Sequence, residues 1–220
     1  QHLYKSLQYD PVKDFEPVAR TANLPFMVVV GADSPAKSLA DLLALARSRP
    51  DGLTYAMAST SSLIASETIA KLGGVKLSGV MYKASPQAIG DVAAGRVDFM
   101  AADFVTAMPQ MSGGRVRVLA VADDRRSALL PNVPAVAETL KGFSCGSWNG
   151  LFVPAGTPKA IVDRLARETL DILARPDVVA RLAGIGFEVA PLGPVPFAAY
   201  LREQSELWGR RIREAGIQPQ

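Results

Sequence analysis

The sequence has few of the residues that many enzymes use for acid–base, nucleophilic and metal chemistry. Its 220 residues contain one histidine, His2, and one cysteine, Cys145. A serine–histidine–aspartate triad, a histidine base and a histidine–cysteine metal site are therefore all disfavoured. The single cysteine also excludes an intrachain disulfide and leaves the redox compartment open.

Long apolar stretches and a strong net charge are also missing. No stretch is apolar for long enough to span a membrane, and no signal peptide is visible. The formal net charge is only +3, and the basic residues do not cluster with aromatic ones, so we expect no nucleic-acid partner. Hydrophobic residues make up 49% and charged residues 20% of the chain, as in an ordinary globular protein that buries a core.

Short apolar segments alternate with amphipathic ones through the middle of the chain. Such alternation is typical of a parallel sheet with helices on both faces, the α/β class. The first twenty residues are predicted to be an extended loop. Strands are predicted at residues 25–30, 53–57, 79–82, 97–101, 116–122 and 148–153, and helices at residues 39–46, 63–72, 86–94 and 106–111.

After residue 153 the chain is predicted to be mostly helical. The first helix, residues 158–174, is expected to pack through a face formed by Ile161, Leu165, Ile172 and Leu173. Residues 187–190 form the one strand expected here, which is too little sheet to cover the helices. Either these helices pack on the central unit, or part of their own domain is absent.

Four hydroxyl side chains follow the predicted strand at residues 53–57: Ser59, Thr60, Ser61 and Ser62. A strand that turns into a helix through such residues can bind an anion, because free N–H groups and the helix dipole add to the hydroxyl donors. The run contains no Lys or Arg, which favours a carboxylate or other small anion over a polyphosphate. The alternative is that Ser62 caps the helix, with Thr60 and Ser61 filling the turn.

Further loops follow predicted strands at the same edge of the sheet, where open α/β sheets bind ligands. One loop places Lys83 and Ser85 before a helix, which gives a second helix start with a hydroxyl and a nearby cation. The alternative is that Lys83 is solvated and Ser85 is a cap, and for Lys83 alone we favour this alternative. In the next loop, Asp103 could hold an ammonium or a ligand hydroxyl, or it could cap the following helix. Residues 123–126 are typical of a solvated charged turn.

Other acidic residues give only a weak case for an enzyme. Glu67 lies one turn into the helix after the hydroxyl run and is a candidate base, but no acid pairs with it at helical spacing. Asp98 stands at the entrance of a strand, away from the loops, and is predicted to be structural. Glycine patterns of nucleophile elbows, Walker loops and dinucleotide sites are missing. The pattern predicts no enzyme, no cofactor and no metal.

Ten short motifs occur in a characteristic order along nearly the whole chain. They are LYKSL at residues 3–7, YDPVKDF at 9–15, YKAS at 82–85, GRVDFM at 95–100, LAV at 119–121, RS at 126–127, LPNVP at 130–134, AE at 137–138, SWNGLF at 147–152 and PAGTP at 154–158. In this order the chain resembles the Bug-type receptors, the periplasmic substrate-binding proteins of tripartite tricarboxylate transporters. The family usually has glycine where Ala84 stands.

The resemblance implies a type II periplasmic-binding-protein architecture, a two-lobe Venus flytrap without catalytic activity. Such a protein lies in the periplasm, captures a small carboxylate between its lobes and serves membrane transporter subunits. The ligand-binding residues expected from the pattern and the resemblance are Ser59, Thr60, Ser61, Ser62, Tyr82, Lys83, Ala84, Ser85 and Asp103. In the family, the aspartate in the last of these loops helps to set specificity.

The chain departs from the family pattern at its start and at the predicted site. Family members carry a long segment before the residues matched here, with a first strand, a ligand loop, a helix and two more strands. The hydroxyl run is shorter than usual and lacks glycine, and Leu63 stands where the family often has histidine. The usual aspartate is replaced by Ala102, and Asp103 is displaced by one, a shift that can turn its side chain away from the ligand.

We therefore expect one complete parallel-sheet lobe, residues 27–153, and an incomplete, mostly helical second lobe from residues 1–26 and 154–220. The expected function is an extracytoplasmic receptor for a small carboxylate. The alternative is a non-binding remnant or interaction protein whose exposed helix faces drive self-association into a homodimer. An enzyme that uses Glu67 or Asp103 is the least favoured reading.

Overall fold

A computed structural model describes residues 1–214 and 216 and divides the chain into two compact units. Unit 1 consists of Gln1–Asn23 and Trp148–Gln220, and unit 2 is the continuous stretch Leu24–Ser147. This boundary differs from the predicted lobe of residues 27–153, because residues 148–153 belong to a strand in the sheet of unit 1. That unit 1 is an incomplete lobe stays a prediction.

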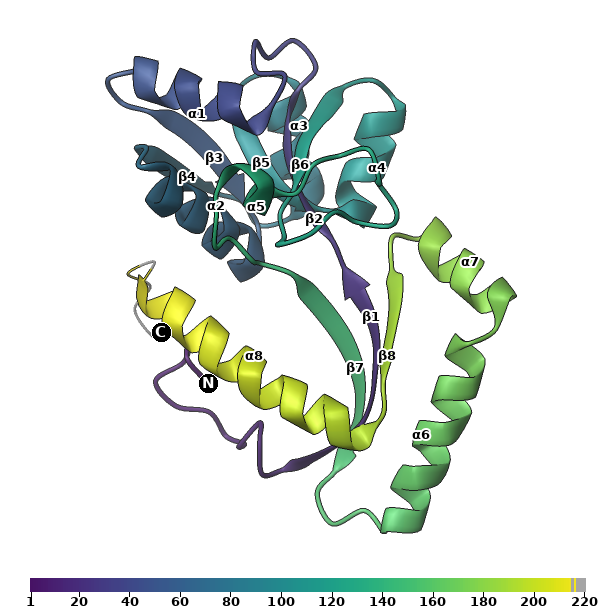
Figure 1. The fold of residues 1–220 in the computed structure, drawn as a ribbon. Helices are drawn as coiled ribbons and strands as arrows, with labels where there is room; N and C mark the ends of the chain where they lie inside the picture. The colour runs from purple at the N-terminus through teal and green to yellow at the C-terminus, as the bar shows by residue number, and fades with distance from the viewer. Residues whose placement is uncertain (215, 217–220) are drawn as a thin grey trace. The chain divides into compact units, whose positions relative to one another are not determined.

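Unit 2 contains a five-stranded sheet (Figure 1). In spatial order its strands are β4 (Leu77–Met81), β3 (Leu53–Met57), β5 (Phe99–Asp103), β2 (Phe26–Gly31) and β6 (Val116–Val121). Strand β3 pairs in parallel with β4 and β5, whereas β2 pairs antiparallel with β5 and β6. The sheet is therefore mixed, and the prediction of an all-parallel sheet is wrong for β2. This strand runs the other way because the chain enters the sheet at the edge where β5 ends, with Phe26 opposite Asp103.

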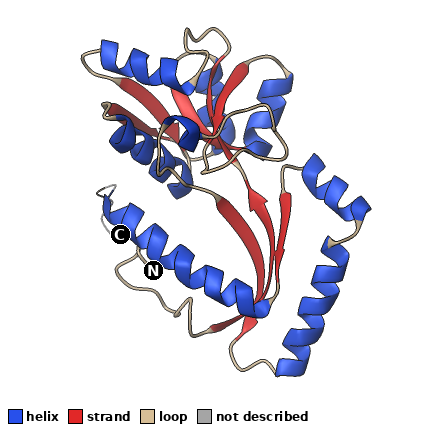
Figure 2. Cartoon of the chain, in the orientation of Figure 1, coloured by secondary structure: helices blue, strands red, loops and turns tan. Residues whose placement is uncertain are grey.

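Helices cover both faces of this sheet, as the alternation predicts, and Figure 2 shows them flanking the strands. They are α1 (Leu39–Ser48), α2 (Thr60–Gly73), α3 (Ser85–Ala93), α4 (Phe104–Ser112) and α5 (Val136–Thr139), the last of which the pattern does not predict. Local chemistry sets their ends. Ser38 caps α1 by accepting the N–H of Asp41 at 3.1 Å, and Gly74 ends α2 in the left-handed conformation, with φ of 58°.

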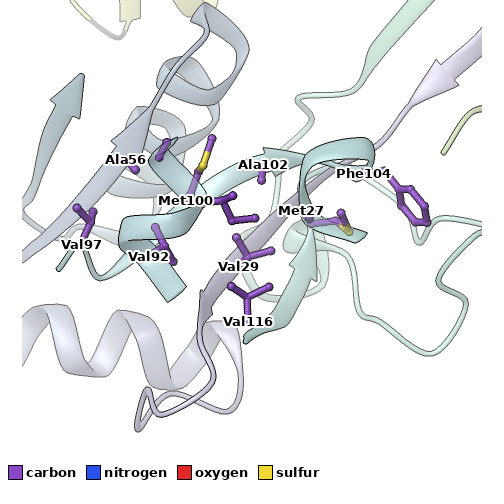
Figure 3. Packing of buried hydrophobic residues seen from close by; sticks show 12 residues of the cluster. Met27, Val29, Ala56, Val92, Val97, Met100, Ala102, Phe104 and Val116 are labelled. Atoms are coloured by element: carbon purple, nitrogen blue, oxygen red, sulfur yellow. The ribbon is translucent and has the colours of Figure 1, made fainter. Parts of the chain in front are cut away.

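The alternation of side chains along each strand divides the core of unit 2 between the two faces. Met27 and Val29 of β2 pack on one face with Val92 of α3 (Figure 3). Tyr55 of β3 and Phe99 of β5 point to the opposite face, where their ring centroids lie 5.9 Å apart. Both faces of the central strands β2 and β5 are thus buried, which explains why these strands are almost continuously apolar, whereas the edge strand β4 is largely exposed.

The prediction of an extended loop over the first twenty residues is wrong from residue 15 onward, where strand β1 (Phe15–Leu24) begins. In unit 1, β1 lies between β7 (Ser147–Pro154) and β8 (Glu188–Leu192). It pairs antiparallel with β8, with Arg20 opposite Leu192. Unit 1 therefore has three strands of sheet rather than the one expected.

Helix α6 (Lys159–Leu173) packs on this sheet through a different face from the predicted one. Val162 and Ala166 are buried against Val18 and Ala19 of β1. The predicted contacts of three residues are wrong, since Ile161, Leu165 and Ile172 are 49%, 37% and 49% exposed. Helix α7 (Pro176–Gly184) follows and buries no residue.

Aromatic rings join helix α8 (Pro194–Glu214) to strand β7. Phe197 is fully buried, and its ring centroid lies 5.5 Å from that of Trp148 and 5.2 Å from that of Phe152. A side chain at Gly150 would collide with the Phe197 ring, so this glycine permits the close approach of the helix and the strand.

Candidate functional site

Four strands of unit 2 end at one edge of the sheet. Strands β3, β4 and β5 are mutually parallel, and β6 runs with them because it and β5 are both antiparallel to β2. The last residues of β3 and β4, Met57 and Met81, are paired, so the loops that follow them leave the sheet at the same level. This edge is where an open α/β sheet binds its ligands.

The hydroxyl run forms the start of α2 and not a loop before it. Ser59 is the N-cap, because its backbone is extended and its Oγ accepts the N–H of Ser62 at 3.2 Å. The alternative that Ser62 caps the helix is wrong. The Ser62 side chain is fully buried, and its Oγ donates to the carbonyl oxygen of Ala56 at 3.4 Å. Ser59 and Thr60 are exposed and Ser61 is partly buried.

The start of α3 lacks the side-chain cap that α2 has. Ala84 occupies the N-cap position with an extended backbone and makes no side-chain hydrogen bond to the helix. Pro86 stands within the first two helical positions and has no N–H, so the first turn offers the N–H groups of Ser85 and Gln87. Ser85 is the first residue of the helix, so the alternative that it is the cap is wrong, whereas Lys83 is exposed as expected. The backbone N–H groups of this first turn are therefore not covered by a side chain at the cap.

Tyr82, the first residue of the same loop, directs its hydroxyl to its own unit. It donates to Oδ2 of Asp91 in α3 at 2.8 Å, and Nη1 of Arg96 donates to Oδ1 of the same carboxylate at 2.8 Å. The hydrogen bonds from Tyr82 and Arg96 lower the pKa of Asp91. Partial burial and the Asp91 hydrogen bond raise the pKa of Tyr82. A direct ligand contact by the Tyr82 hydroxyl stays a prediction.

Asp103 caps α4, which was one of its two predicted roles. Its Oδ1 accepts the backbone N–H of Thr106 at 2.8 Å, and its Oδ2 accepts the Thr106 hydroxyl at 2.9 Å. Both carboxylate oxygens thus have a partner inside unit 2. The capping role is confirmed, and a role in specificity stays a prediction.

The two remaining acidic candidates serve as internal acceptors. Asp98 accepts the N–H and hydroxyl of Thr54 at 2.8 and 2.9 Å and Nη1 of Arg49 at 2.7 Å, which confirms its structural role. Glu67 accepts the hydroxyl of Tyr55 at 2.5 Å. Burial, with help from Glu67, raises the pKa of this tyrosine. Glu67 is therefore held by a buried phenol.

The charged turn after β6 is exposed at residues 124–126, as predicted, and it also contributes to an ion pair. Arg126 donates through Nε and Nη2 to the two carboxylate oxygens of Glu138 at 2.7 and 2.8 Å. This ion pair lowers the pKa of Glu138 to about 2. A shallow hollow of about 450 Å³ next to it includes none of the predicted site residues, and its lining is Asp124, Ala137, Glu138, Lys141, Gly142, Phe143 and Ser144.

Two observations concern metal binding and membrane spanning in the described part of the chain. Among its residues, no three histidine, cysteine, aspartate or glutamate side chains come together as metal ligands. No helix within it has the length and apolar content needed to cross a membrane.

The whole chain is similar to one family of transport receptors. Residues 1–217 match the tripartite tricarboxylate transporter family receptor, TctC. The chain is 37% identical over 216 residues to a UPF0065 protein from the tcbD-tcbE intergenic region of Pseudomonas sp. strain P51, which covers 96% of this chain and 64% of the relative. It is 25% identical to Protein BugT of Bordetella pertussis, covering 97% of this chain and 67% of the relative. The chain thus spans about two thirds of the length of these relatives.

Several solved structures have the same fold, and one of them is a periplasmic binding protein. Rpa4515 of R. palustris, solved with adipate, matches with a TM-score of 0.88 and 30% identity over 99% of this chain and 74% of its own. The periplasmic binding protein BugD matches with a TM-score of 0.83 and 28% identity, over 100% and 75%. MatC of Rhodopseudomonas palustris, with bound malate, matches with a TM-score of 0.77 and 31% identity, over 96% and 74%.

These matches confirm the predicted fold class and the predicted family. The related proteins are solute-binding receptors and not enzymes, in agreement with the prediction from the motifs. The chain belongs to the tripartite tricarboxylate transporter receptor family.

Proposed function

We propose that this chain is a periplasmic receptor that binds a small dicarboxylate and serves the membrane components of a tripartite tricarboxylate transporter. Membership of the receptor family supports the transporter partnership and the location. The relatives solved with adipate and with bound malate, at 30% and 31% identity, support the ligand class.

The observation that carries this proposal is the start of α3. Because Ala84 offers no side-chain acceptor, the first-turn N–H groups can serve an external anion. The Ser85 hydroxyl adds a donor, and Lys83 adds a positive charge. A carboxylate bound in this way gains charge-assisted hydrogen bonds, each worth about 1.5–3 kcal/mol, together with the favourable field of the helix dipole.

The start of α2 lies beside this position along the edge of the sheet. Adjacent strands are about 4.8 Å apart, and the paired ends of β3 and β4 launch the two helices from the same level. We assign ligand contacts to Ser59, Thr60, Ser61, Lys83, Ala84 and Ser85. We assign supporting roles to Ser62, Tyr82 and Asp103, whose side chains bond within unit 2.

Calorimetric titration tests the proposal directly. Adipate and malate are the probes, and adipamide is the matched control, because it has nearly the shape of adipate without its charges. We expect at least one dicarboxylate to bind and the diamide to give no heat of binding. A folded protein that binds neither dicarboxylate, or that binds the diamide as well as adipate, contradicts the proposal.

Self-association is a second candidate function, favoured by the exposed apolar surface of unit 1. Helix α7 buries no residue, and Ile161 and Ile172 of α6 are both 49% exposed. A second copy of the chain that covers this surface would remove it from water. Light scattering is expected to show a dimer that Ile161→Glu together with Ile172→Glu converts to a monomer. A wild-type monomer that binds adipate argues against this candidate.

A further inference from the structure

We propose that Tyr82, Asp91 and Arg96 form a positioning network that holds the start of α3 in the geometry that receives the carboxylate. This inference rests on the proposed carboxylate site and changes the part played by Tyr82. Its phenol acts through Asp91 and does not itself need to touch the ligand.

The network connects the loop at residues 82–85 to strand β3 through its backbone and to helix α3 through the Tyr82 side chain. At the first end, the N–H of Tyr82 donates to the carbonyl oxygen of Met57 at 2.8 Å, which continues the pairing of β4 with β3. The Tyr82 ring packs against the hydrophobic core of unit 2. Its hydroxyl then reaches Asp91, in the second turn of α3, at 2.8 Å. The loop formed by residues 82–85 is thus bridged from its first residue to the body of the helix that it starts.

Arg96 secures the aspartate from the other side. Its Nη1 donates to Oδ1 of Asp91 at 2.8 Å, while its backbone N–H donates to the Asp91 carbonyl oxygen at 2.9 Å. The Arg96 side chain is 72% exposed, so solvent screens its ion pair. The partly buried bond from Tyr82 therefore contributes more to the position of the loop than the bond from Arg96.

The first turn of α3 differs from those of α2 and α4, because it has to be ordered while its N–H groups stay open to a ligand. A capping side chain, such as Ser59 at α2 or Asp103 at α4, orders the first turn but occupies its N–H groups. A helix start without a cap leaves these groups open but less well ordered. At α3 the position is held from Asp91, away from the first turn, so the N–H groups are ordered and remain open to an anion.

A second network of similar composition, with threonine in place of tyrosine, provides a control. At the opposite edge of the sheet, Asp98 accepts the hydroxyl of Thr54 at 2.9 Å and Nη1 of Arg49 at 2.7 Å. Asp98→Ala therefore removes a carboxylate with a hydroxyl partner and an arginine partner, as Asp91→Ala does, but far from the proposed site. Asp98 also accepts the Thr54 N–H, so its loss should cost at least as much stability, and a merely structural role of Asp91 would not weaken binding more than the loss of Asp98 does.

The test compares Tyr82→Phe, Asp91→Ala, their double variant and Asp98→Ala in the full chain. Titration with adipate and malate is expected to show about three- to tenfold weaker binding for the first two. The double variant should bind no more weakly than the weaker-binding single variant, because both substitutions remove the same hydrogen bond between Tyr82 and Asp91. Asp98→Ala should lower the melting temperature and leave the affinity unchanged.

Amide hydrogen exchange of the ligand-free protein gives a second readout that does not depend on a ligand. Tyr82→Phe and Asp91→Ala are expected to speed exchange in residues 82–90, and Asp98→Ala is not. Unchanged exchange in this segment overturns the inference, as does an equal loss of affinity in the Asp98 variant. If the wild type binds neither probe, the proposed site fails, and the exchange data alone decide whether the network positions the loop.

Discussion

Ala84 occupies a position at which serine or aspartate would stabilise the helix, and this makes stability and binding separable. An aspartate there would cap α3 and add about 1 kcal/mol, or about 2–4 °C in melting temperature. Its carboxylate would also take the N–H groups that we assign to the ligand. We expect Ala84→Asp to melt higher and to lose adipate binding, measured by thermal unfolding and calorimetry.

Ala84→Ser is the control for charge at this position. Its neutral hydroxyl caps the helix without repelling an anion, so we expect a smaller gain in stability and a partial loss of affinity. A variant that melts at a higher temperature but binds adipate more weakly is folded, so its loss of affinity cannot come from misfolding. An Ala84→Asp protein that binds adipate as tightly as the wild type would remove the start of α3 from the proposed site.

Glu138 makes the stability of unit 2 depend on pH. Arg126 lowers its pKa in the folded protein to about 2, below the ordinary value of 4.5. The ion pair therefore stabilises the fold fully above about pH 4.5, and this contribution is lost as the pH falls toward 2. In urea unfolding between pH 7 and pH 2.5, wild type should lose more stability than Glu138→Gln.

High salt is the control for this prediction. Both side chains of the pair are nearly half exposed, so 1 M NaCl should reduce the difference between the two pH profiles. Parallel profiles of the wild type and the Glu138→Gln variant at low salt would show that the ion pair does not contribute.

At the scale of elements, Arg117 joins β6 to the turn after β2. Its two Nη atoms donate to the carbonyl oxygens of Ala32, Ser34 and Ala36 at 2.8, 3.2 and 3.2 Å. Lysine keeps the charge but lacks the planar fork that reaches several acceptors. We expect Arg117→Lys to lower the free energy of unfolding by about 1–2 kcal/mol in urea titrations.

The position of this turn supplies the control. Arg117 lies at the start of β6, at the edge of the sheet opposite the proposed site. Adipate affinity should therefore stay at the wild-type value. A loss of affinity comparable to that of Tyr82→Phe would mean that general destabilisation, and not position, sets ligand binding.

Elements that depend on local signals could be predicted from the sequence. The strand at Leu53–Met57 was predicted with its observed bounds, since β-branched and aromatic residues lie between a turn and a hydroxyl cluster. Strand β1 could not be predicted, because it pairs with β8 across most of the chain. The direction of β2 likewise follows from where the chain enters the sheet, which no local pattern records.

The candidate site was predictable as an edge of a sheet but not in its contacts. Four adjacent hydroxyls can each act as a cap, and only the extended backbone at Ser59 decides which one does. The sequence also does not reveal that Tyr82 donates to Asp91, since this contact needs the strand and the helix in place. The assignment of ligand contacts therefore stays a prediction that the proposed titrations test.

At the scale of the molecule, the two units differ in how the chain forms them. Unit 2 is one continuous stretch, Leu24–Ser147, whereas unit 1 combines both ends of the chain. Most of the buried hydrophobic residues belong to unit 2. We expect a fragment of residues 24–147 to unfold cooperatively in circular dichroism, because it contains a complete sheet covered on both faces.

A fragment of residues 148–220 is the natural comparison. It lacks β1, the central strand of its sheet, so we expect no cooperative transition. A fragment of residues 24–147 that shows no cooperative unfolding would mean that unit 2 depends on unit 1 for its stability.

The pairing of β1 with β8 has a consequence for synthesis of the chain. Arg20 leaves the ribosome long before its partner Leu192, by an interval on the order of ten seconds at ordinary elongation rates. During that time all of unit 2 can fold, while β1 first has no neighbour and then has only β7, since β8 is made last. A newly made chain therefore has an incompletely paired strand β1 after unit 2 has folded. The unpaired backbone of this strand is where we expect a chaperone to bind.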